Sequence, residues 1–496
     1  MLTRRAILAT APALLTAPAA PQAAPSASRP NILWLMTDEH RPDSLACYGS
    51  PWGHSPTLDR LAAEGALFES AYTPSPVCVP CRCSLLTGNS GSTTGVLHNE
   101  ARLGPDTRFL TWRFEDAGYQ TASFGKKHYF FTNPRQAFQI EGGSPTEGIV
   151  DPARYGKGYD PDQHDVVQYP ILPQQKIQRR WILAGRFPAP EDETAEARNV
   201  TLATQWLDRR DTSKPFLLRL SLNAPHTPVV TPARYLSLID PNRIRIPSPT
   251  AAELAAQPER ERLLLRSFEG SDALSPEHLR KSQHYYYARC AFADATIGRL
   301  LDFMRTRGLL DNTIVVMTAD HGTHLGDHGL LQKQTFYEQV ATVPYIFWAP
   351  GRIRPGTRFR TPVSTLGLLP TLLDLAGLPF DGVEGASLAP SLRRGKEPPR
   401  HPVVSEIAFG YQGWRDHDRQ VMVRHGDWKL SLFSAPRDPA RFAANPDGSL
   451  YNLRRDPNES VTLFANADAQ AHRRRLERHI AEWDAKRVAP TANTRP

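Results

Sequence analysis

Three of the chain's five cysteines fall within six residues, in the segment CVPCRC at 78–83. Pro80 suits the first turn of a helix because its φ is fixed and its nitrogen carries no hydrogen, and Gly88 can end that helix. Cys78 would then lie at the helix N-terminus, where free N–H groups and the helix dipole favour an anion. Arg82 lies one turn further on the same face and adds a permanent positive charge. These residue types and spacings predict a nucleophile that faces an oxyanion.

The cysteines also allow other interpretations. A Cys-x-x-Cys-x-Cys cluster can bind a metal or form a redox-active disulfide. A zinc site would need a fourth ligand, and the remaining Cys47 and Cys290 lack the spacing of a ligand pair. Three small apolar residues at the start of a helix are the plainest alternative. One short motif leaves these interpretations open.

Four apolar runs of strand length are each followed by ionisable residues. The runs are 31–36, 119–124, 215–222 and 313–318, and the residues that follow them are Asp38 and Glu39, Lys126 and His128, His226, and Asp320 and His321, respectively. A continuous apolar run predicts a strand buried on both faces, as in a parallel sheet. Ligands bind beyond the carboxyl ends of the strands in such sheets. We therefore expect these side chains to meet at one edge of the sheet.

Asp38, Glu39 and Asp320 would bring three carboxylates into that site, together with the imidazole of His321. Three negative charges in one site repel one another unless a cation neutralises them. Oxygen-rich ligation suits a hard divalent ion such as Ca²⁺ or Mg²⁺, and the histidine makes Mn²⁺ a further candidate. The pattern predicts one divalent cation, with Ca²⁺ preferred. Taken singly, each carboxylate could instead cap a helix or fill a turn.

Helix patterns separate these strands. The predicted helices span about 56–64, with Ser55 as its N-cap, 194–210 and 276–307, and a fifth apolar run at 343–348 predicts another strand. Alternating strands and helices predict an α/β fold in which a large, mostly parallel sheet lies between layers of helices. Residues 133–193 are rich in proline, glycine and polar residues, and this segment is either a functional lid or contains elements that the pattern does not reveal.

The pattern changes near residue 378. The short apolar runs beyond it predict antiparallel strands at 403–407, 421–424, 428–433 and 449–453, followed by a helix from about Asp468, its expected N-cap, to about 487. We therefore predict a catalytic domain at 29–378 and a smaller α+β domain at 379–496, formed by an antiparallel sheet and a helix.

The first 28 residues have the pattern of an export signal. Arg4 and Arg5 precede an Ala- and Leu-rich run that ends near Ala20, which is similar to a twin-arginine signal peptide. The run is too short to span a membrane, so we expect no membrane span after signal removal and a periplasmic or secreted protein. The net charge of +8 comes from scattered basic residues, without the stripe that nucleic-acid binding requires.

The segment Cys78-x-Pro80-x-Arg82, followed by Leu-Thr-Gly at 86–88, resembles the signature of the type I sulfatases, which are part of the alkaline phosphatase-like superfamily. Cys81 stands where serine is common in that signature. The resemblance continues, in order, along nearly the whole chain after the signal. Further matching elements are Gly125-Lys126-x-His128, Ala224-Pro225-His226, residues 318–322 (TADHG), and Lys333 with Tyr337-Glu338.

The resemblance implies that a formylglycine-generating enzyme oxidises Cys78 to formylglycine before export. It also implies a set of metal ligands: Asp38, Glu39, Asp320, His321 and the modified residue 78. Glu39 stands where the family usually has aspartate. The site would therefore combine a modified residue with one divalent cation.

The resemblance further implies how the reaction proceeds. Lys126, Lys333 and His226 would hold the sulfate oxygens and offset their charge. Hydrated formylglycine would attack sulfur, and a histidine or lysine would protonate the leaving alcohol. His128 would then deprotonate the second hydroxyl so that sulfate is expelled, while Arg82 would hold the formylglycine in place.

The alcohol part of the substrate has no decodable motif in the sequence. We expect a sulfated carbohydrate, with choline sulfate or an aryl sulfate as the next candidates. The nearest alternative is a phosphonate or phosphodiester monoester hydrolase of the same superfamily. A glycan-binding protein on a degenerate scaffold should have lost Cys78 or a metal carboxylate, and this chain keeps both. A thiol-redox protein would require reactive free thiols at Cys78, Cys81 and Cys83.

Overall fold

A computed structural model describes residues 29–131, 133, 135–143, 165–168, 182–258, 260–262, 274–409, 418–433 and 448–486. The predicted export signal at 1–28 and most of the segment at 144–181 lie outside these residues. Within the described part, none of the helices combines the length and the apolar content that crossing a bilayer requires.

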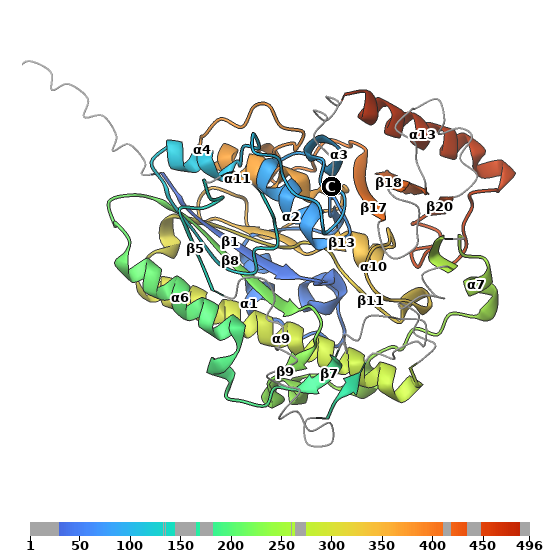
Figure 1. Ribbon diagram of the computed structural model, residues 1–496, viewed down its shortest axis with the longest axis horizontal. Helices are drawn as coiled ribbons and strands as arrows, with labels where there is room; N and C mark the ends of the chain where they lie inside the picture. Colours follow the sequence, from blue (N-terminus) through green and yellow to red (C-terminus); the bar gives the residue numbers. More distant parts are fainter. Residues whose placement is uncertain are drawn as a thin grey trace, which may run out of the picture.

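The described residues form a central sheet of eight strands (Figure 1). Its strands follow the order β15 (Thr357–Phe359), β2 (Ala66–Phe68), β14 (Tyr345–Trp348), β10 (Thr313–Ala319), β1 (Asn31–Asp38), β8 (Phe216–Pro225), β4 (Gln120–Gly125) and β5 (Ile140–Gly142). The strands from β10 to β5 run parallel to one another, whereas β14 is antiparallel to both of its neighbours. The predicted α/β class with a large, mostly parallel sheet is confirmed.

The fifth predicted strand differs from the expectation in its start. Pro344 divides the apolar run, and a proline cannot donate a ladder hydrogen bond. Residues Thr342–Val343 (β13) therefore pair with Ala71–Tyr72 (β3) in a separate small sheet, and β14 begins only at Tyr345.

Helices cover both faces of the sheet because the strand residues are apolar on both sides. Leu33 and Leu35 of β1 pack in a core with α1 (Pro56–Glu64), α6 (Ala195–Arg209) and α9 (Pro276–Thr306). On the opposite face Ile32 and Trp34 pack in a second core. The helices of that face are α2 (Cys78–Thr87), α4 (Thr111–Asp116) and α11 (Leu368–Leu375), and Figure 1 shows the two helical layers on either side of β1 and β8.

The remaining described elements are short. They are β6 (Val167–Gln168), β7 (Ile182–Arg186), β9 (Val230–Thr231), β11 (His324–Leu325), β12 (Leu331–Gln332), β16 (Val363–Ser364), α3 (Gly91–Thr94), α7 (Ala251–Ala255), α10 (Glu338–Ala341) and α12 (Ala389–Arg394). Strands β5, β6 and β7 fall in the segment at 133–193, whose role as a lid stays a prediction.

The start of α1 is capped differently from the expectation. Ser55 makes no capping hydrogen bond; its hydroxyl oxygen instead accepts from the Ala46 amide at 3.1 Å. The free amides of Thr57 and Leu58 donate to the carboxylate of Asp294, on α9, at 3.0 and 2.8 Å. A long-range carboxylate therefore takes the place of the predicted local cap.

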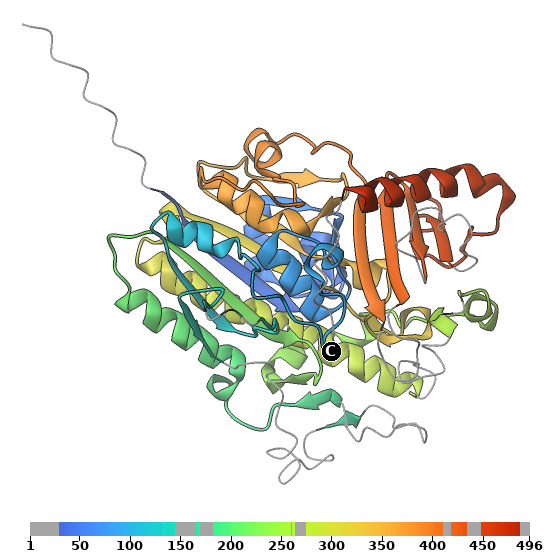
Figure 2. The ribbon, with the colours of Figure 1, turned by 45° about the horizontal axis from the view of Figure 1, so that its top comes forward.

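The C-terminal part contains a four-stranded antiparallel sheet with one long helix, as predicted. Its strands are β17 (Val403–Phe409), β18 (Asp418–His425), β19 (Trp428–Leu432) and β20 (Gly448–Asn452), and its helix is α13 (Gln470–Ala485). Leu476 and Ile480 of α13 share a buried core with residues of this sheet, and Figure 2 shows the helix lying against the strands. The expected N-cap at Asp468 is wrong, because Asn466 caps a 3₁₀ turn at Ala467–Ala469 that precedes α13. The domain boundary at 378 stays a prediction.

Candidate active site

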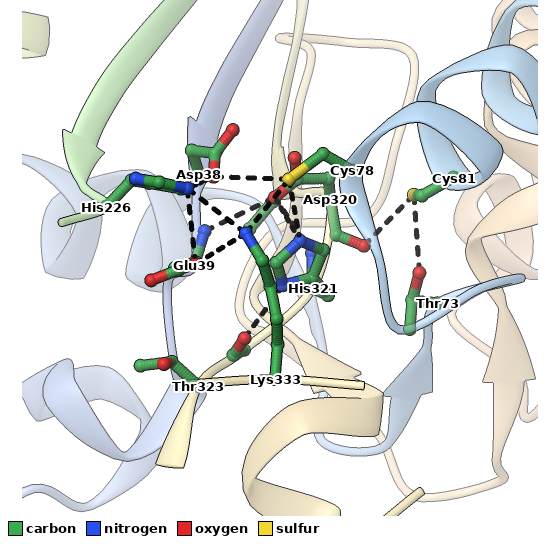
Figure 3. Close-up of polar contacts among 12 residues, drawn as sticks. Asp38, Glu39, Thr73, Cys78, Cys81, His226, Asp320, His321, Thr323 and Lys333 are labelled. Atoms are coloured by element: carbon green, nitrogen blue, oxygen red, sulfur yellow. Dashed lines mark hydrogen bonds and ion pairs between the residues drawn. The ribbon is translucent and has the colours of Figure 1, made fainter. Parts of the chain in front are cut away.

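The carboxyl ends of four adjacent parallel strands deliver the candidate site. Strands β10, β1, β8 and β4 are neighbours in the sheet, so the residues that follow them lie close together. Asp320, Asp38, His226 and Lys126 are all buried at this edge (Figure 3 shows the first three). The structure thus brings together the side chains that the sequence placed after separate strands.

Helix α2 places Cys78 over this edge. Val77 is its extended N-cap, Cys78 is its first residue, and Gly88 ends it with a φ of 71°. That positive φ is readily adopted by glycine and costs other residues energy. The Cys78 side chain is buried at the helix N-terminus, as the sequence predicts.

Arg82 joins the two aspartates. Its guanidinium contacts Asp38 Oδ2 at 2.7 Å and Asp320 Oδ2 at 2.9 Å, and all three side chains are fully buried. The same guanidinium donates to Ser221 Oγ at 3.0 Å and to the Lys126 carbonyl at 3.2 Å. A planar guanidinium with several donors is suited to such multiple contacts. Arg82 therefore fixes the carboxylates that surround position 78.

The Cys78 sulfur lies among positively charged groups. Its Sγ is 3.1 Å from Lys333 Nζ and 3.3 Å from His321 Nε2 (Figure 3). Burial by itself would raise the pKa of the Cys78 thiol, but Lys333, Lys126 and His321 outweigh burial and hold this pKa well below its usual value. A side-chain hydrogen bond with His128 acts in the same direction. The surroundings of position 78 therefore stabilise negative charge.

Four buried side chains fit a divalent cation. Asp38, Cys78, Asp320 and His321 each offer one ligand atom, and these atoms lie within 4.8 Å of one another. His321 Nδ1 donates to the Gly322 carbonyl at 2.8 Å, which leaves Nε2, the nitrogen that faces Cys78 Sγ, as the ligand atom of a neutral imidazole. Two carboxylates and an imidazole suit a hard or borderline divalent ion.

The charges of the two aspartates also fit such an ion. Burial by itself would raise the pKa of Asp38, yet Lys126, His226 and Arg82 hold it below its usual value. Burial and the nearby charge of Asp38 raise the pKa of Asp320. A divalent cation would remove this mutual repulsion.

Glu39 lies in an adjoining group of carboxylate and imidazole ligands. With Asp38 and His226 it forms a second set of atoms within 4.8 Å of one another. Its Oε1 is 2.6 Å from Lys333 Nζ and 3.3 Å from His226 Nε2. The structure therefore places the Glu39 carboxylate against an ammonium group and an imidazole, and its role as a metal ligand stays a prediction.

Lys126 is directed into the site by the turn that precedes it. Gly125 has a φ of 105°, and a Cβ at this position would lie 1.9 Å from the Ser221 carbonyl oxygen. A residue with a side chain is therefore excluded there. Lys126 Nζ contacts Asp38 Oδ2 at 2.7 Å, and the His226 and Lys333 side chains meet at 3.1 Å between Nε2 and Nζ.

Some contacts of the site were not predicted from the sequence. Cys81 donates its thiol hydrogen to the Asp320 carbonyl at 3.0 Å, and Ser221 contacts Arg82. A serine and an arginine within the otherwise apolar run at 215–222 were a possible signal for a buried polar contact. Cys81 carried no such signal, because its partner is 239 positions away.

Two family models match the chain. The model described as Sulfatase matches residues 30–378, and the model described as N-sulphoglucosamine sulphohydrolase, C-terminal, matches residues 326–486. The choline-sulfatase of Rhizobium meliloti (strain 1021) is 30% identical over 484 residues, which cover 92% of this chain and 87% of the relative. The N-acetylglucosamine-6-O-sulfatase of Bacteroides thetaiotaomicron is 26% identical over 518 residues, covering 92% and 86%.

Solved structures share the fold. One is the structure of a protein in complex with its substrate, D-glucosamine-2-N,6-O-disulfate. It has a TM-score of 0.70 at 23% identity, and the match covers 94% of this chain and 100% of that protein's chain. The phosphonate monoester hydrolase of Agrobacterium radiobacter has a TM-score of 0.77 at 22% identity, covering 93% and 96%. These likenesses support the alkaline phosphatase-like fold. With the family model spanning most of its length, the chain belongs to the sulfatase family, a family of sulfuric ester hydrolases.

Proposed function

We propose that this protein hydrolyses sulfate esters of carbohydrates, with a formylglycine made from Cys78 as nucleophile and one Ca²⁺ as cofactor. The observation that carries the proposal is the convergence on Cys78 of Lys333, His321 and Asp38 within 3.1 to 4.0 Å. The names of two relatives, a choline-sulfatase and an N-acetylglucosamine-6-O-sulfatase, support a small sulfated alcohol or sugar as the substrate.

Asp38, Asp320, His321 and the oxidised residue 78 would hold the cation, and Glu39 would adjoin it. The bound ion would supply Lewis-acid polarisation of a sulfate oxygen, and the hydrated aldehyde would supply a hydroxyl nucleophile. Sγ of Cys78 marks the place of that nucleophile. Ca²⁺ is favoured because carboxylate oxygens are the main ligands.

Two ammonium groups and an imidazole would bind the sulfate group. Lys126, Lys333 and His226 approach the site from three different segments and are buried there. Charges that are already in place in a buried site stabilise a developing anion without reorganisation. Arg82 would maintain the spacing of Asp38 and Asp320 throughout.

Proton transfer would use a base and an acid near position 78. His128, which is hydrogen-bonded to Cys78, would accept a proton from the hydroxyl of residue 78. His226 or Lys333 would give a proton to the departing alcohol oxygen. A histidine is suited to both directions because an imidazole nitrogen can accept a proton and give it up again.

Maturation would precede export. A formylglycine-generating enzyme would oxidise Cys78, and the signal at 1–28 would then direct the protein to the periplasm or the medium. Mass spectrometry of the peptide that carries position 78, on protein from the native host, should show an aldehyde. An unmodified cysteine in fully active enzyme would contradict the proposed nucleophile.

The substrate class is tested by comparing sulfate release from N-acetylglucosamine 6-sulfate, choline sulfate and 4-nitrophenyl sulfate, with a phenyl phosphonate ester as the competing class. We expect the highest kcat/KM with the sugar sulfate. Faster cleavage of the phosphonate ester would assign the protein to the alternative activity, and preference for choline sulfate would contradict the carbohydrate substrate.

The cofactor is tested by elemental analysis of purified protein and by chelation. We expect about one Ca²⁺ per chain, because the two sets of ligand atoms share Asp38 and therefore adjoin a single ion. Chelation should lower both turnover and the melting temperature, since a bound ion stabilises the folded state. Full activity of metal-free protein would refute the cofactor assignment.

A further inference from the structure

Lys333 lies in the strained connection between β12 and α10, residues 332–338, which follows the β11–β12 hairpin. The residues on either side of it, Gln332 and Gln334, have φ values of 71° and 73°. A residue with a side chain in this left-handed region is strained and persists only where surrounding contacts enforce it. The contacts that hold this connection therefore decide where the Lys333 ammonium lies.

Local contacts hold the first half of this connection, residues 332–334. Thr323 Oγ1 donates to the Gln332 carbonyl at 3.1 Å, and the Gln334 amide donates to the Pro76 carbonyl at 3.2 Å. Both partners belong to the main domain. The second half, which leads into α10, is held from elsewhere.

Lys429, on β19 of the C-terminal sheet, holds the second half. Its side chain is 1% exposed, and its Nζ donates to the Phe336 carbonyl at 2.8 Å. The same Nζ contacts Glu338 Oε1 at 2.7 Å and Glu459 Oε1 at 2.5 Å. Glu459 Oε2 in turn accepts from the Glu338 amide at 2.7 Å. One buried ammonium thus binds a carbonyl and a carboxylate at the end of the connection.

We propose that Lys429 is a positioning residue for Lys333. By fixing Phe336 and Glu338 it holds the connection at 332–338 in its strained form and keeps the Lys333 ammonium 3.1 Å from Cys78 Sγ. The C-terminal sheet thereby takes part in sulfate binding without contacting sulfate. This inference rests on the proposed role of Lys333 in binding the sulfate group.

The test is a double-mutant cycle with Lys429→Met and Lys333→Ala. We expect Lys333→Ala to lower kcat/KM by about 100-fold or more, as for loss of one charged donor. Lys429→Met should lower kcat/KM about 10-fold, mainly through KM, and should weaken inhibition by inorganic sulfate by a similar factor. Because Lys429 acts through Lys333, the double variant should be no worse than Lys333→Ala.

Lys429→Met leaves the buried Glu459 and the partly buried Glu338 without their cation, which destabilises a fold strongly. The variant Lys429→Met with Glu459→Gln removes one of these charges and keeps the cycle measurable. Arg289→Met is the matched control, because Arg289 is also buried, donates to the Val230 carbonyl and contacts a buried carboxylate, Glu196, at 2.9 Å. Its effect on kcat/KM should combine additively with Lys333→Ala.

Two outcomes are distinguishable. Additive losses from Lys429→Met and Lys333→Ala, or an unchanged KM in the Lys429 variants, would overturn the positioning role. Unchanged turnover in Lys333→Ala would instead overturn the proposed role of Lys333 in sulfate binding, and with it the inference that depends on that role.

Discussion

Position 78 illustrates how the neighbours of one side chain define its chemistry. Cys78 and Cys81 are three positions apart on the same buried helix, yet their thiols differ. Lys333 and Lys126 help to hold the pKa of Cys78 well below its usual value, whereas burial and the charge of Asp320 raise that of Cys81 well above it. One sulfur therefore favours an anion, and the other remains a neutral hydrogen-bond donor.

Replacement of Cys78 by alanine should abolish turnover. We expect a loss of at least about 10³-fold in kcat, because the variant has no nucleophile. The fold should remain intact by circular dichroism, since alanine is tolerated in the first turn of a helix. Substantial activity of the purified variant, beyond contamination, would contradict the mechanism.

Cys81→Ser should retain turnover within about threefold, because a hydroxyl can replace the thiol as donor to the Asp320 carbonyl. Cys81→Ala should lower kcat/KM further, because that carbonyl loses its donor next to a proposed metal ligand. Steady-state kinetics on the sugar sulfate measure both. Equal activity of the serine and alanine variants would show that the hydrogen bond is irrelevant to the site.

At the scale of elements, helices are placed by contacts between distant segments. The first turn of α1 depends on Asp294 of α9, which joins two helices of the same face of the sheet. Helix α2 depends on Gly88 at its end and on Arg82, which ties it to β1 and β10. Both helices are therefore held in register with the strands that carry the site.

Asp294→Ala should destabilise the protein by about 2 kcal/mol, because two amides of α1 lose their acceptor. Urea unfolding followed by circular dichroism measures the change. Ser55→Ala serves as the comparison, and its effect should be smaller because Ser55 does not cap α1. A larger loss from Ser55→Ala would contradict the long-range cap.

At the scale of the molecule, the C-terminal sheet meets the main domain through a buried charged cluster. Lys429 faces two carboxylates there, Glu338 and Glu459, and Tyr72 of β3 donates to Glu338 at 2.9 Å. Burial raises the pKa of Glu459 to about 7, Lys429 opposes this rise, and the charge of Glu338 adds to it. One ammonium does not fully balance two carboxylates, of which Glu459 is fully buried and Glu338 partly buried.

This cluster predicts a pH dependence of stability. Because the folded-state pKa of Glu459 lies above its usual value of 4.5, the folded state binds the proton more tightly than the unfolded state. The contribution is therefore complete below pH 4.5 and is lost as pH rises to about 7, by about 3 kcal/mol. Unfolding free energies of the wild type and Glu459→Gln, compared across this range, measure it; a constant difference would contradict the prediction.

Much of the fold could be predicted because its signals are local. The buried runs that form β1, β4, β8 and β10 are continuous in sequence. The long helices α6 and α9 each begin at an adjacent residue whose side chain caps the first turn. The strands β2 and β15 were missed, because three residues carry too short a pattern.

The sequence by itself determined which residues could form the site. The chemistry of Cys78 follows from its place at a helix start, and that of Asp38, Asp320 and Lys126 from their places at the ends of buried strands. Only the tertiary structure decided how these groups pair. Arg82 meets Asp320 across 238 positions, and Lys333 meets Cys78 across 255. Such pairings depend on the crossing of distant segments in space, and no local pattern encodes that crossing.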